Sequence, residues 1–219
     1  MPKPRKKSVK SVKNKLWIYT EGKKTEQYYI KGYIQDKHST SRRVEYVSVE
    51  DVKQNTAESL IKRIKTDKAC SDHKKGDIYW VAYDRESTQK YEGHRHQKAL
   101  DAARGANINV ALSNVCVEQY LLWHFSASQA SYTSYDNLIA KSNLKKYLAG
   151  VGIDNYEKGD PLLYDKLKNK VDAAKANSEK VNKCIVDASA KGKATPIHEL
   201  SPYSDFYKLL NAIDEFVAS

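Results

Sequence analysis

The sequence predicts an α/β fold, in which a parallel four-stranded sheet is flanked by helices and followed by a C-terminal helical extension. Short apolar runs alternate with segments of helical spacing through the first half of the chain. This order is typical of a parallel sheet covered on both faces. The second half has helical patterns throughout. With 219 residues, 40% of them hydrophobic, the chain is long enough to form one packed core.

Four segments have the composition of strands. Residues 16–20 (LWIYT) and 77–84 (DIYWVAYD) are apolar runs rich in branched and aromatic side chains, as in buried strands. Residues 44–50 (VEYVSVE) alternate between apolar and polar, and residues 108–113 (INVALS) form the fourth segment. In a parallel sheet the carboxyl ends of these strands share one edge, which is where open α/β sheets bind their ligands.

Helical spacing marks the segments between and after the strands. The helices are expected at residues 23–36, 56–70, 91–104, from 117 onward within 117–125, then at 136–149, 160–190 and 203–217. Asn55 or Thr56 is expected to cap the second helix, and Gly105 to end the third. The chain then divides into a flexible basic arm (1–15), an α/β core (16–126) and a helical extension packed on that core (127–219).

The net charge of +11 favours a polyanionic partner such as nucleic acid, although much of the excess lies in residues 1–15. A basic protein without such a partner is the alternative. No apolar stretch is long enough to span a membrane and no secretory signal is present, so a cytoplasmic protein without a membrane partner is expected. Cys70, Cys116 and Cys184 are too far apart for a zinc site, and Cys116 is expected to be a buried thiol.

Acidic residues follow two of the expected strands. Glu21 comes directly after the first strand, Asp84 ends the third, and Glu86 lies two residues further on. If the two strands are neighbours in the sheet, their carboxylates meet. Three such oxygen ligands would suit Mg²⁺ or Mn²⁺, and a basic protein with such a site is suited to phosphodiester chemistry. Each acid taken alone also fits an ordinary solvated turn.

The motifs around these acids resemble those of a known family. EGKKTEQYY (21–29) and VAYDRES (81–87) resemble the Toprim domain, which has a glutamate after its first strand and a DxD motif after its third. More narrowly, the chain resembles the RloB family, through SNVCVEQYLLWHF (113–125), YEK (156–158) and ATPIHEL (194–200). The resemblance covers about residues 16–210, and the 113–125 block makes it specific.

The resemblance implies a Toprim-like metal site that cleaves phosphodiesters. Glu21 matches the glutamate assigned to acid/base work, metal binding or both, and Asp84 and Glu86 match the metal-binding acids. The chain departs from the pattern in having Glu86 in place of aspartate, and its 113–125 block lacks the usual proline and has Val117 and Gln119 in place of larger apolar residues. Glu118 either completes the metal shell or is a first-turn acid that stabilises its helix.

Basic residues near these acids are expected to contact the substrate. Lys158 of the YEK element is expected to act as a catalytic cation that stabilises the transition state. Lys24 either holds phosphate near a helix N-terminus or lies on a solvated face. The residues expected to contact nucleic acid are Lys23, Lys24, Arg85, His94, Arg95 and His96. His124 and His198 are interpreted as structural.

A small metal-dependent nuclease fits these residues best. RloB-like proteins are associated with separate ATPases of the AAA or ABC type in restriction and abortive-infection loci, which implies an antiphage-defence effector. The chain itself has no P-loop motif. The alternatives are a non-catalytic Toprim-like module that binds nucleic acid or the ATPase, and a regulatory protein whose basic arm binds RNA. An ion pair between Glu86 and a lysine would favour a binding module. The sequence leaves DNA or RNA as substrate, one or two metals, and the oligomeric state open.

Overall fold

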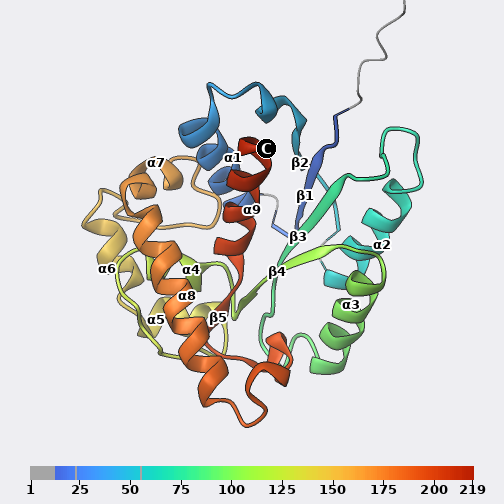
Figure 1. The fold of residues 1–219 in the computed structure, drawn as a ribbon. Coiled ribbons are helices and arrows are strands. Elements are labelled where there is room, and N and C mark those ends of the chain that lie inside the picture. The colour runs from blue at the N-terminus through green and yellow to red at the C-terminus, as the bar shows by residue number, and fades with distance from the viewer. Residues whose placement is uncertain (1–12, 23, 55) are drawn as a thin grey trace, which may run out of the picture.

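A computed structural model describes residues 13–22, 24–54 and 56–219. Five strands form one sheet in the order β2-β1-β3-β4-β5 (Figure 1). β1, β2, β3 and β4 run parallel, and β5 is antiparallel to β4. The strands are β1 (Leu16–Thr20), β2 (Val47–Glu50), β3 (Ile78–Asp84), β4 (Asn109–Asn114) and β5 (Tyr203–Ser204). The predicted α/β class with a mostly parallel sheet is confirmed.

Helices cover both faces of this sheet, with α2 and α3 on one face and α1, α4, α8 and α9 on the other (Figure 1). The helices are α1 (Thr25–His38), α2 (Ala57–Asp67), α3 (Gly93–Gly105), α4 (Glu118–Trp123), α5 (Tyr135–Lys141), α6 (Leu144–Ala149), α7 (Leu163–Leu167), α8 (Val171–Ala188) and α9 (Phe206–Ala218). No helix in the described ranges is both long enough and apolar enough to cross a membrane.

Alternation along the strands explains the two-faced packing. Leu16 and Ile18 of β1 point into the cluster beneath α1, α4 and α9, whereas Trp17 and Tyr19 point into the cluster beneath α2 and α3. All four side chains are at most 7% exposed. A strand buried on both faces therefore reads as a continuous apolar run, as it does here.

Local chemistry fixes the helix boundaries. Thr56 caps α2 through a capping box, in which Ser59 N donates to Thr56 Oγ1 (3.3 Å) and Thr56 N to Ser59 Oγ (3.3 Å). Thr56 is thus confirmed as one of the two expected caps, while Asn55 lies outside the described residues.

The strand predicted over 44–50 is shorter than expected, because Arg42–Tyr46 form a 3₁₀ helix and β2 begins only at Val47.

The structure adds a fifth strand to the four predicted, and the helix predicted over 203–217 is confirmed except that it begins at Phe206, because residues 203 and 204 form this strand. Tyr203 and Ser204 pair with the outer edge of β4, and the hydroxyls of Ser113 and Ser204 are 2.8 Å apart. Asn182 of α8 donates from Nδ2 to the carbonyl of Ser204 (2.8 Å) and accepts from its N–H (3.1 Å). Two residues are too few to show strand periodicity, so the pairing partner decides their conformation. The Asn114–Val115 and Ser201–Pro202 peptide bonds are cis.

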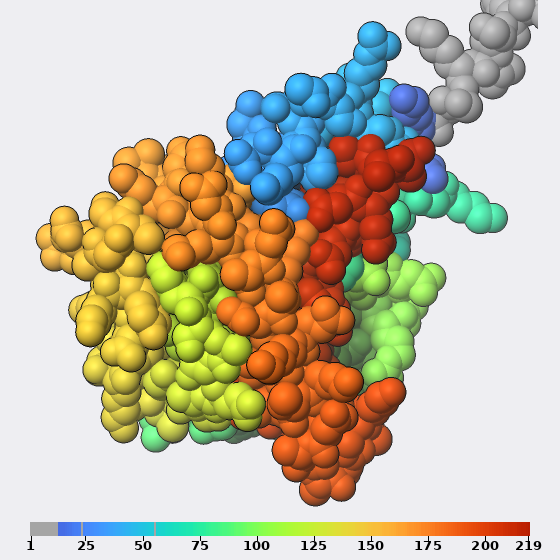
Figure 2. All heavy atoms as spheres, turned by 60° about the vertical axis from the view of Figure 1, so that its left-hand side comes forward, coloured from blue at the N-terminus to red at the C-terminus, as the bar shows by residue number. Residues whose placement is uncertain are grey.

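The helices that follow residue 126 share one apolar core with α1, α4 and the sheet. In Figure 2 the orange segments, which include α7 and α8, pack against α1 and α9. Leu144, Leu148, Leu163 and Leu167 are completely buried in that core. The residues after 126 therefore pack on the α/β part through an apolar interior, to which hydrogen bonds such as Gly159 N to Thr25 Oγ1 (2.9 Å) are added.

Candidate functional site

The first and third strands are neighbours, and they bring Glu21 and Asp84 together as the sequence predicts. The β1–β3 register places Thr20 opposite Ala82, and Glu21 N continues the pairing by donating to the carbonyl of Ala82 (2.9 Å). Asp84 N then donates to Glu21 Oε2 (3.0 Å). The two acids thus lie at the carboxyl-terminal edge of the sheet, where a parallel α/β sheet collects its functional groups.

A pocket of about 600 Å³ opens at this edge, and its walls combine acids with bases. Its charged and imidazole side chains are Glu21, Glu26, Asp84, Glu86, Lys24, Lys90, Arg95, His96 and Lys158. We call this the carboxylate pocket. Its size lies within the range of roughly 300–1,000 Å³ that is common for ligand sites.

Glu26 is a site residue that the sequence analysis missed. It lies in the first turn of α1 and is only 6% exposed, yet it lines the carboxylate pocket. A Cβ on Gly22 would lie 1.9 Å from Glu26 Oε2, so the absence of a side chain at Gly22 makes room for this carboxylate. Its position in the sequence could have identified it, because Glu26 lies in the first turn of the helix that follows Glu21 at the end of β1.

Crowding of acids shapes the electrostatics of the pocket. Burial raises the pKa of Glu21 to about 7, and the negative charges of Glu86 and Glu26 add to the rise, which the N–H of Asp84 opposes. Burial also raises the pKa values of Asp84 and Glu26, and each lies in the field of further carboxylates. The pocket therefore holds acidic groups whose negative charge is incompletely compensated.

Glu118 lies behind Lys158 rather than on the wall of the pocket. Glu118 is completely buried at the start of α4, where Tyr156 Oη donates to Glu118 Oε1 (3.0 Å) and Lys158 Nζ is 3.6 Å from Oε2. Burial disfavours the charged form of Lys158, but the carboxylates of Glu118 and Asp84 outweigh it and raise its pKa. Lys158 lines the carboxylate pocket, so it brings a permanent positive charge there.

A glycine holds the segment that carries Lys158 against α1. Gly159 adopts a left-handed backbone with φ of +87°, and a Cβ there would lie 2.5 Å from the Cβ of Lys24. Gly159 N also donates to Thr25 Oγ1 (2.9 Å). The ammonium group of Lys158 lies 4.2 Å from the ring centre of Tyr135, which adds a cation–π contact. These contacts position Lys158 relative to the end of β1.

Glu86 is held by an ion pair. Its backbone has a left-handed φ of 56°, and Glu86 N donates to the carbonyl of Val115 (2.8 Å). Lys90 Nζ donates to Glu86 Oε1 (2.6 Å), so this carboxylate is directed to a lysine. Across residues 13–22, 24–54 and 56–219, no group of three or more His, Cys, Asp or Glu side chains is arranged so that it could hold a metal ion.

Two of the residues expected to contact nucleic acid are buried, which corrects that expectation for them. Arg85 is 6% exposed; its Nε donates to the carbonyl of His198 (3.1 Å) and its Nη1 to that of Tyr91 (2.9 Å). His96 is 1% exposed, and burial lowers its pKa to about 4, so its imidazole is neutral near pH 7. The side chain of Arg85 therefore connects the segments around Tyr91 and His198 through hydrogen bonds to their backbone. Lys23 lies outside the described residues.

The other basic candidates lie at the surface. Lys24 is exposed on the rim of the carboxylate pocket, and His94 is exposed in the first turn of α3 beside Glu92 (3.1 Å). Arg95 lines the pocket, but its Nη2 donates to Glu58 (2.6 Å). Of the three, Lys24 is therefore best placed to meet an anion entering the pocket.

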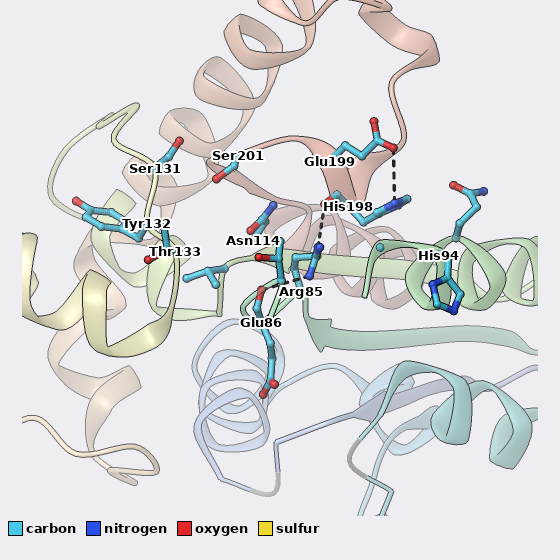
Figure 3. A pocket seen from close by; sticks show the side chains of 14 residues that line it. Arg85, Glu86, His94, Asn114, Ser131, Tyr132, Thr133, His198, Glu199 and Ser201 are labelled. Atoms are coloured by element: carbon cyan, nitrogen blue, oxygen red, sulfur yellow. Dashed lines mark hydrogen bonds and ion pairs between the residues drawn. The ribbon is translucent and has the colours of Figure 1, made fainter. Parts of the chain in front are cut away.

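A second pocket, of about 790 Å³, adjoins the carboxylate pocket, because Glu86 lines both. Figure 3 shows it between the segment Ser131–Thr133, the end of β4 and the segment around His198. Its side chains include Asn114, Ser131, Tyr132, Thr133, His198 and Ser201. Arg85, Glu86, His94 and Glu199 also line it. We call it the neutral pocket, after its amide and hydroxyl groups. His198 is 5% exposed, so its structural interpretation fits, but it also forms part of this wall.

The comparison with known proteins follows this geometry. The sequence model of the family described as RloB-like protein matches residues 16–213. No curated protein and no solved structure matches the chain. The match covers most of the 219 residues and includes every acid of the site described above. The chain therefore belongs to the RloB-like family.

Proposed function

We propose that this protein is a metal-dependent nuclease of the Toprim type that hydrolyses phosphodiester bonds. The observation that carries the proposal is the convergence of Glu21, Glu26, Asp84 and Glu86 in one pocket. Lys158 and Lys24 lie in the same pocket. Acids that could bind a divalent cation, next to cations that could bind phosphate, are suited to metal-dependent phosphodiester hydrolysis.

The donor chemistry of the carboxylate pocket fits Mg²⁺ or Mn²⁺. Both ions prefer carboxylate oxygens, and the raised pKa values of Glu21 and Asp84 reflect burial and negative charge that a divalent cation would compensate. Glu21, Asp84 and Glu86 would hold the ion once Glu86 turns from Lys90, with Glu26 beside them. When bound, such an ion neutralises phosphate charge and lowers the pKa of a coordinated water.

The side chains of this chain have distinct roles in the proposed hydrolysis. Glu21, with a pKa of about 7, is suited to accept a proton from the attacking water at neutral pH. Lys158 offsets the charge that develops on the phosphate oxygens, and Glu118 keeps it protonated and in place. Lys24 at the rim binds a neighbouring phosphate of the substrate.

A binding module that does not cut is the second candidate. The ion pair between Lys90 and Glu86 favours it, because it occupies a carboxylate that the nuclease needs as a ligand. In that case the same pocket would bind phosphate through its lysines. We further propose a cytoplasmic antiphage effector with a separate AAA- or ABC-type ATPase as partner, a role that is supported by the family resemblance.

Calorimetric titration with Mn²⁺ tests the metal site. We expect Glu21→Gln and Asp84→Asn each to weaken Mn²⁺ binding at least tenfold, which is about 1.4 kcal/mol. The matched control is Glu92→Gln, because Glu92 is 68% exposed and outside the pocket. Cleavage of labelled DNA and RNA in Mn²⁺ should fall about 10²- to 10⁴-fold in the Glu21 variant.

Two results would contradict the nuclease proposal. One is wild-type protein that neither binds Mn²⁺ nor cleaves DNA or RNA, with or without the proposed ATPase partner. The other is Mn²⁺ binding that is unchanged in both pocket variants. Either result, together with retained binding of nucleic acid, would support the module that binds without cutting.

A further inference from the structure

We infer that the neutral pocket binds one unpaired nucleobase of the substrate, next to the phosphate that occupies the carboxylate pocket. The inference rests on the proposed function and names the substrate class as single-stranded nucleic acid or a loop. Three features carry it: the continuity of the two pockets, the neutral amide and hydroxyl groups in the walls of the neutral pocket, and a tyrosine ring partly buried against the core.

The two pockets are parts of one surface. Glu86 lines both pockets, and its backbone is held at the end of β4, where Arg85 N donates to the carbonyl of Ser113 (2.8 Å) and Glu86 N to that of Val115 (2.8 Å). A nucleotide whose phosphate enters the carboxylate pocket can therefore place its base across Glu86 in the neutral pocket. The neutral pocket, at about 790 Å³, has ample room for a base and its sugar.

The neutral pocket lacks a free cation among the residues that the structure places in its walls. Its one arginine, Arg85, donates to the carbonyls of His198 and Tyr91, and burial lowers the pKa of His198. His94, which also lines the pocket, lies beside Glu92 (Nδ1 to Oε2, 3.1 Å), and the carboxylates of Glu86 and Glu199 disfavour a second anion there. The lysines Lys24, Lys90 and Lys158 all line the other pocket. The lysines that can pair with a phosphate thus lie in the carboxylate pocket, and an uncharged group is better suited to the neutral one.

Hydrogen-bonding groups of the neutral pocket suit the edge of a base. Asn114 Nδ2 donates to the carbonyl of Leu200 (2.7 Å), which leaves Asn114 Oδ1 as an oriented acceptor. The hydroxyls of Ser131, Thr133 and Ser201 also line the pocket and both donate and accept. Such neutral donors and acceptors are the groups that read base edges in proteins that bind single strands.

Tyr132 supplies an aromatic surface for the same base. Tyr132 is one of the residues that line the neutral pocket (Figure 3). It is also partly buried against the main apolar core. Burial raises its pKa, so the phenol is neutral at physiological pH. A ring fixed by packing loses little freedom when a base stacks on it, which makes it an effective platform.

A base can enter this pocket only if it is not stacked and paired in a duplex. Proteins that seat a base in a pocket either act on single strands or pay to flip the nucleotide out of the helix. We therefore expect single strands and loops to bind more tightly than the same sequence in a duplex. DNA and RNA present the same base chemistry, and the sugar distinguishes them.

Fluorescence anisotropy with short labelled oligonucleotides, in chelator and so without cleavage, tests this inference. We expect Tyr132→Leu, which keeps apolar bulk against the core, to weaken single-strand binding about tenfold, the effect of losing one base–aromatic stack. Duplex binding should stay unchanged. The control is Tyr28→Leu, since Tyr28 is 36% exposed on α1 and lines neither pocket. Thermal unfolding confirms that both variants fold, and Tyr132→Phe should bind as the wild type does.

Three outcomes would overturn the inference: duplex bound as tightly as single strands, single-strand affinity unchanged in Tyr132→Leu, or equal losses in Tyr132→Leu and Tyr28→Leu. A preference for RNA over DNA, or for DNA over RNA, is compatible with the base pocket, and it identifies which sugar the substrate carries. If the protein binds no Mn²⁺ and cleaves nothing but shows the expected anisotropy pattern, the nuclease proposal fails while the base pocket stands.

Discussion

The ion pair between Lys90 and Glu86 bears on whether Glu86 can act as a metal ligand. Both carboxylate oxygens of Glu86 are within ion-pair distance of Lys90 Nζ. Glu86 is also one of the residues that the family resemblance assigns to metal binding. If Glu86 is a ligand held in reserve, removing Lys90 releases it, so Lys90→Met should tighten Mn²⁺ binding several-fold in calorimetry. The control is Lys98→Met, which removes the same charge from an exposed position on α3. Equal Mn²⁺ affinity in the two variants would show that Glu86 does not bind the metal.

At this scale the sequence predicts the acids better than the bases. Glu21 and Asp84 are predictable because strand ends in a parallel sheet share an edge, so their positions follow from strand order alone. Arg85 and His96 are not, since nothing in the local pattern shows that backbone carbonyls and aromatic rings would surround them. Glu26 was missed because an acidic residue in the first turn of a helix is common and is explained by the helix dipole alone.

Among the elements, length decides what the sequence reveals. β1 and β3 stand out because five and seven residues are enough for a buried apolar run. β5 has two residues and is formed by its partners, Ser113 of β4 and Asn182 of α8, from distant parts of the chain. The helix expected over 160–190 is interrupted by a 3₁₀ segment at Lys168–Lys170, which separates α7 from α8.

The N-cap of α2 offers a test of one element. Thr56→Ala removes the Oγ1 that accepts from Ser59 N, so we expect a loss of about 1 kcal/mol in the free energy of unfolding. Urea denaturation measures the loss. Thr66→Ala on the same helix is the matched control, because Thr66 is exposed in the last turn and alanine is a better helix former. Similar losses in both variants would mean that the capping box does not stabilise α2.

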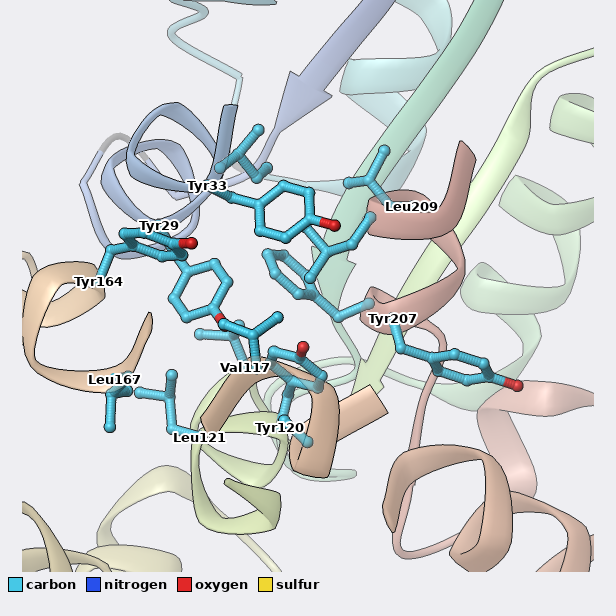
Figure 4. Close-up of a cluster of buried hydrophobic side chains, with 14 of the residues drawn as sticks. Tyr29, Tyr33, Val117, Tyr120, Leu121, Tyr164, Leu167, Tyr207 and Leu209 are labelled. Atoms are coloured by element: carbon cyan, nitrogen blue, oxygen red, sulfur yellow. The ribbon is translucent and has the colours of Figure 1, made fainter. Parts of the chain in front are cut away.

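The stability of the whole molecule depends on a core of aromatic rings beneath α1. Figure 4 shows Tyr29, Tyr33, Tyr120 and Tyr164 gathered there from three helices. His124, 2% exposed, joins this cluster: its Nδ1 bonds the carbonyl of Tyr120 (3.1 Å), so its Nε2 accepts from Tyr29 Oη (2.7 Å). The sequence analysis correctly placed His124 in the core. Cys116, also expected to be buried, is 3% exposed.

This burial makes the unfolding free energy depend on pH through His124. Burial lowers the pKa of His124 from 6.5 to about 4, so the unfolded chain binds the proton more readily. The contribution is complete above pH 6.5 and is lost as the pH falls toward 4. From about pH 7.5 to 5.5, the wild type should therefore lose about 1 kcal/mol more than His124→Gln in urea denaturation.

The exposed His94 is the control for this pH dependence, since it is 73% exposed beside Glu92. His94→Gln should follow the wild type across the same pH range. The comparison between variant and wild type matters, because the raised pKa values of Glu21 and Glu26 act in the opposite direction in that range. A His124→Gln slope equal to that of the wild type would contradict a neutral His124 in the folded state.

The pairing of β4 with β5 also has a consequence for how fast the protein folds. It joins Ser113 to Ser204, 91 positions apart, and the contact of Lys15 with Asp77, at the amino ends of β1 and β3, spans 62 positions. Such connections close large loops before they gain any contact energy, which slows folding across a barrier of chain entropy. Until residues 203–204 arrive, the outer edge of β4 is a bare strand that can pair with another chain. High synthesis rates should therefore favour aggregation, and cooler or slower expression should favour the native sheet.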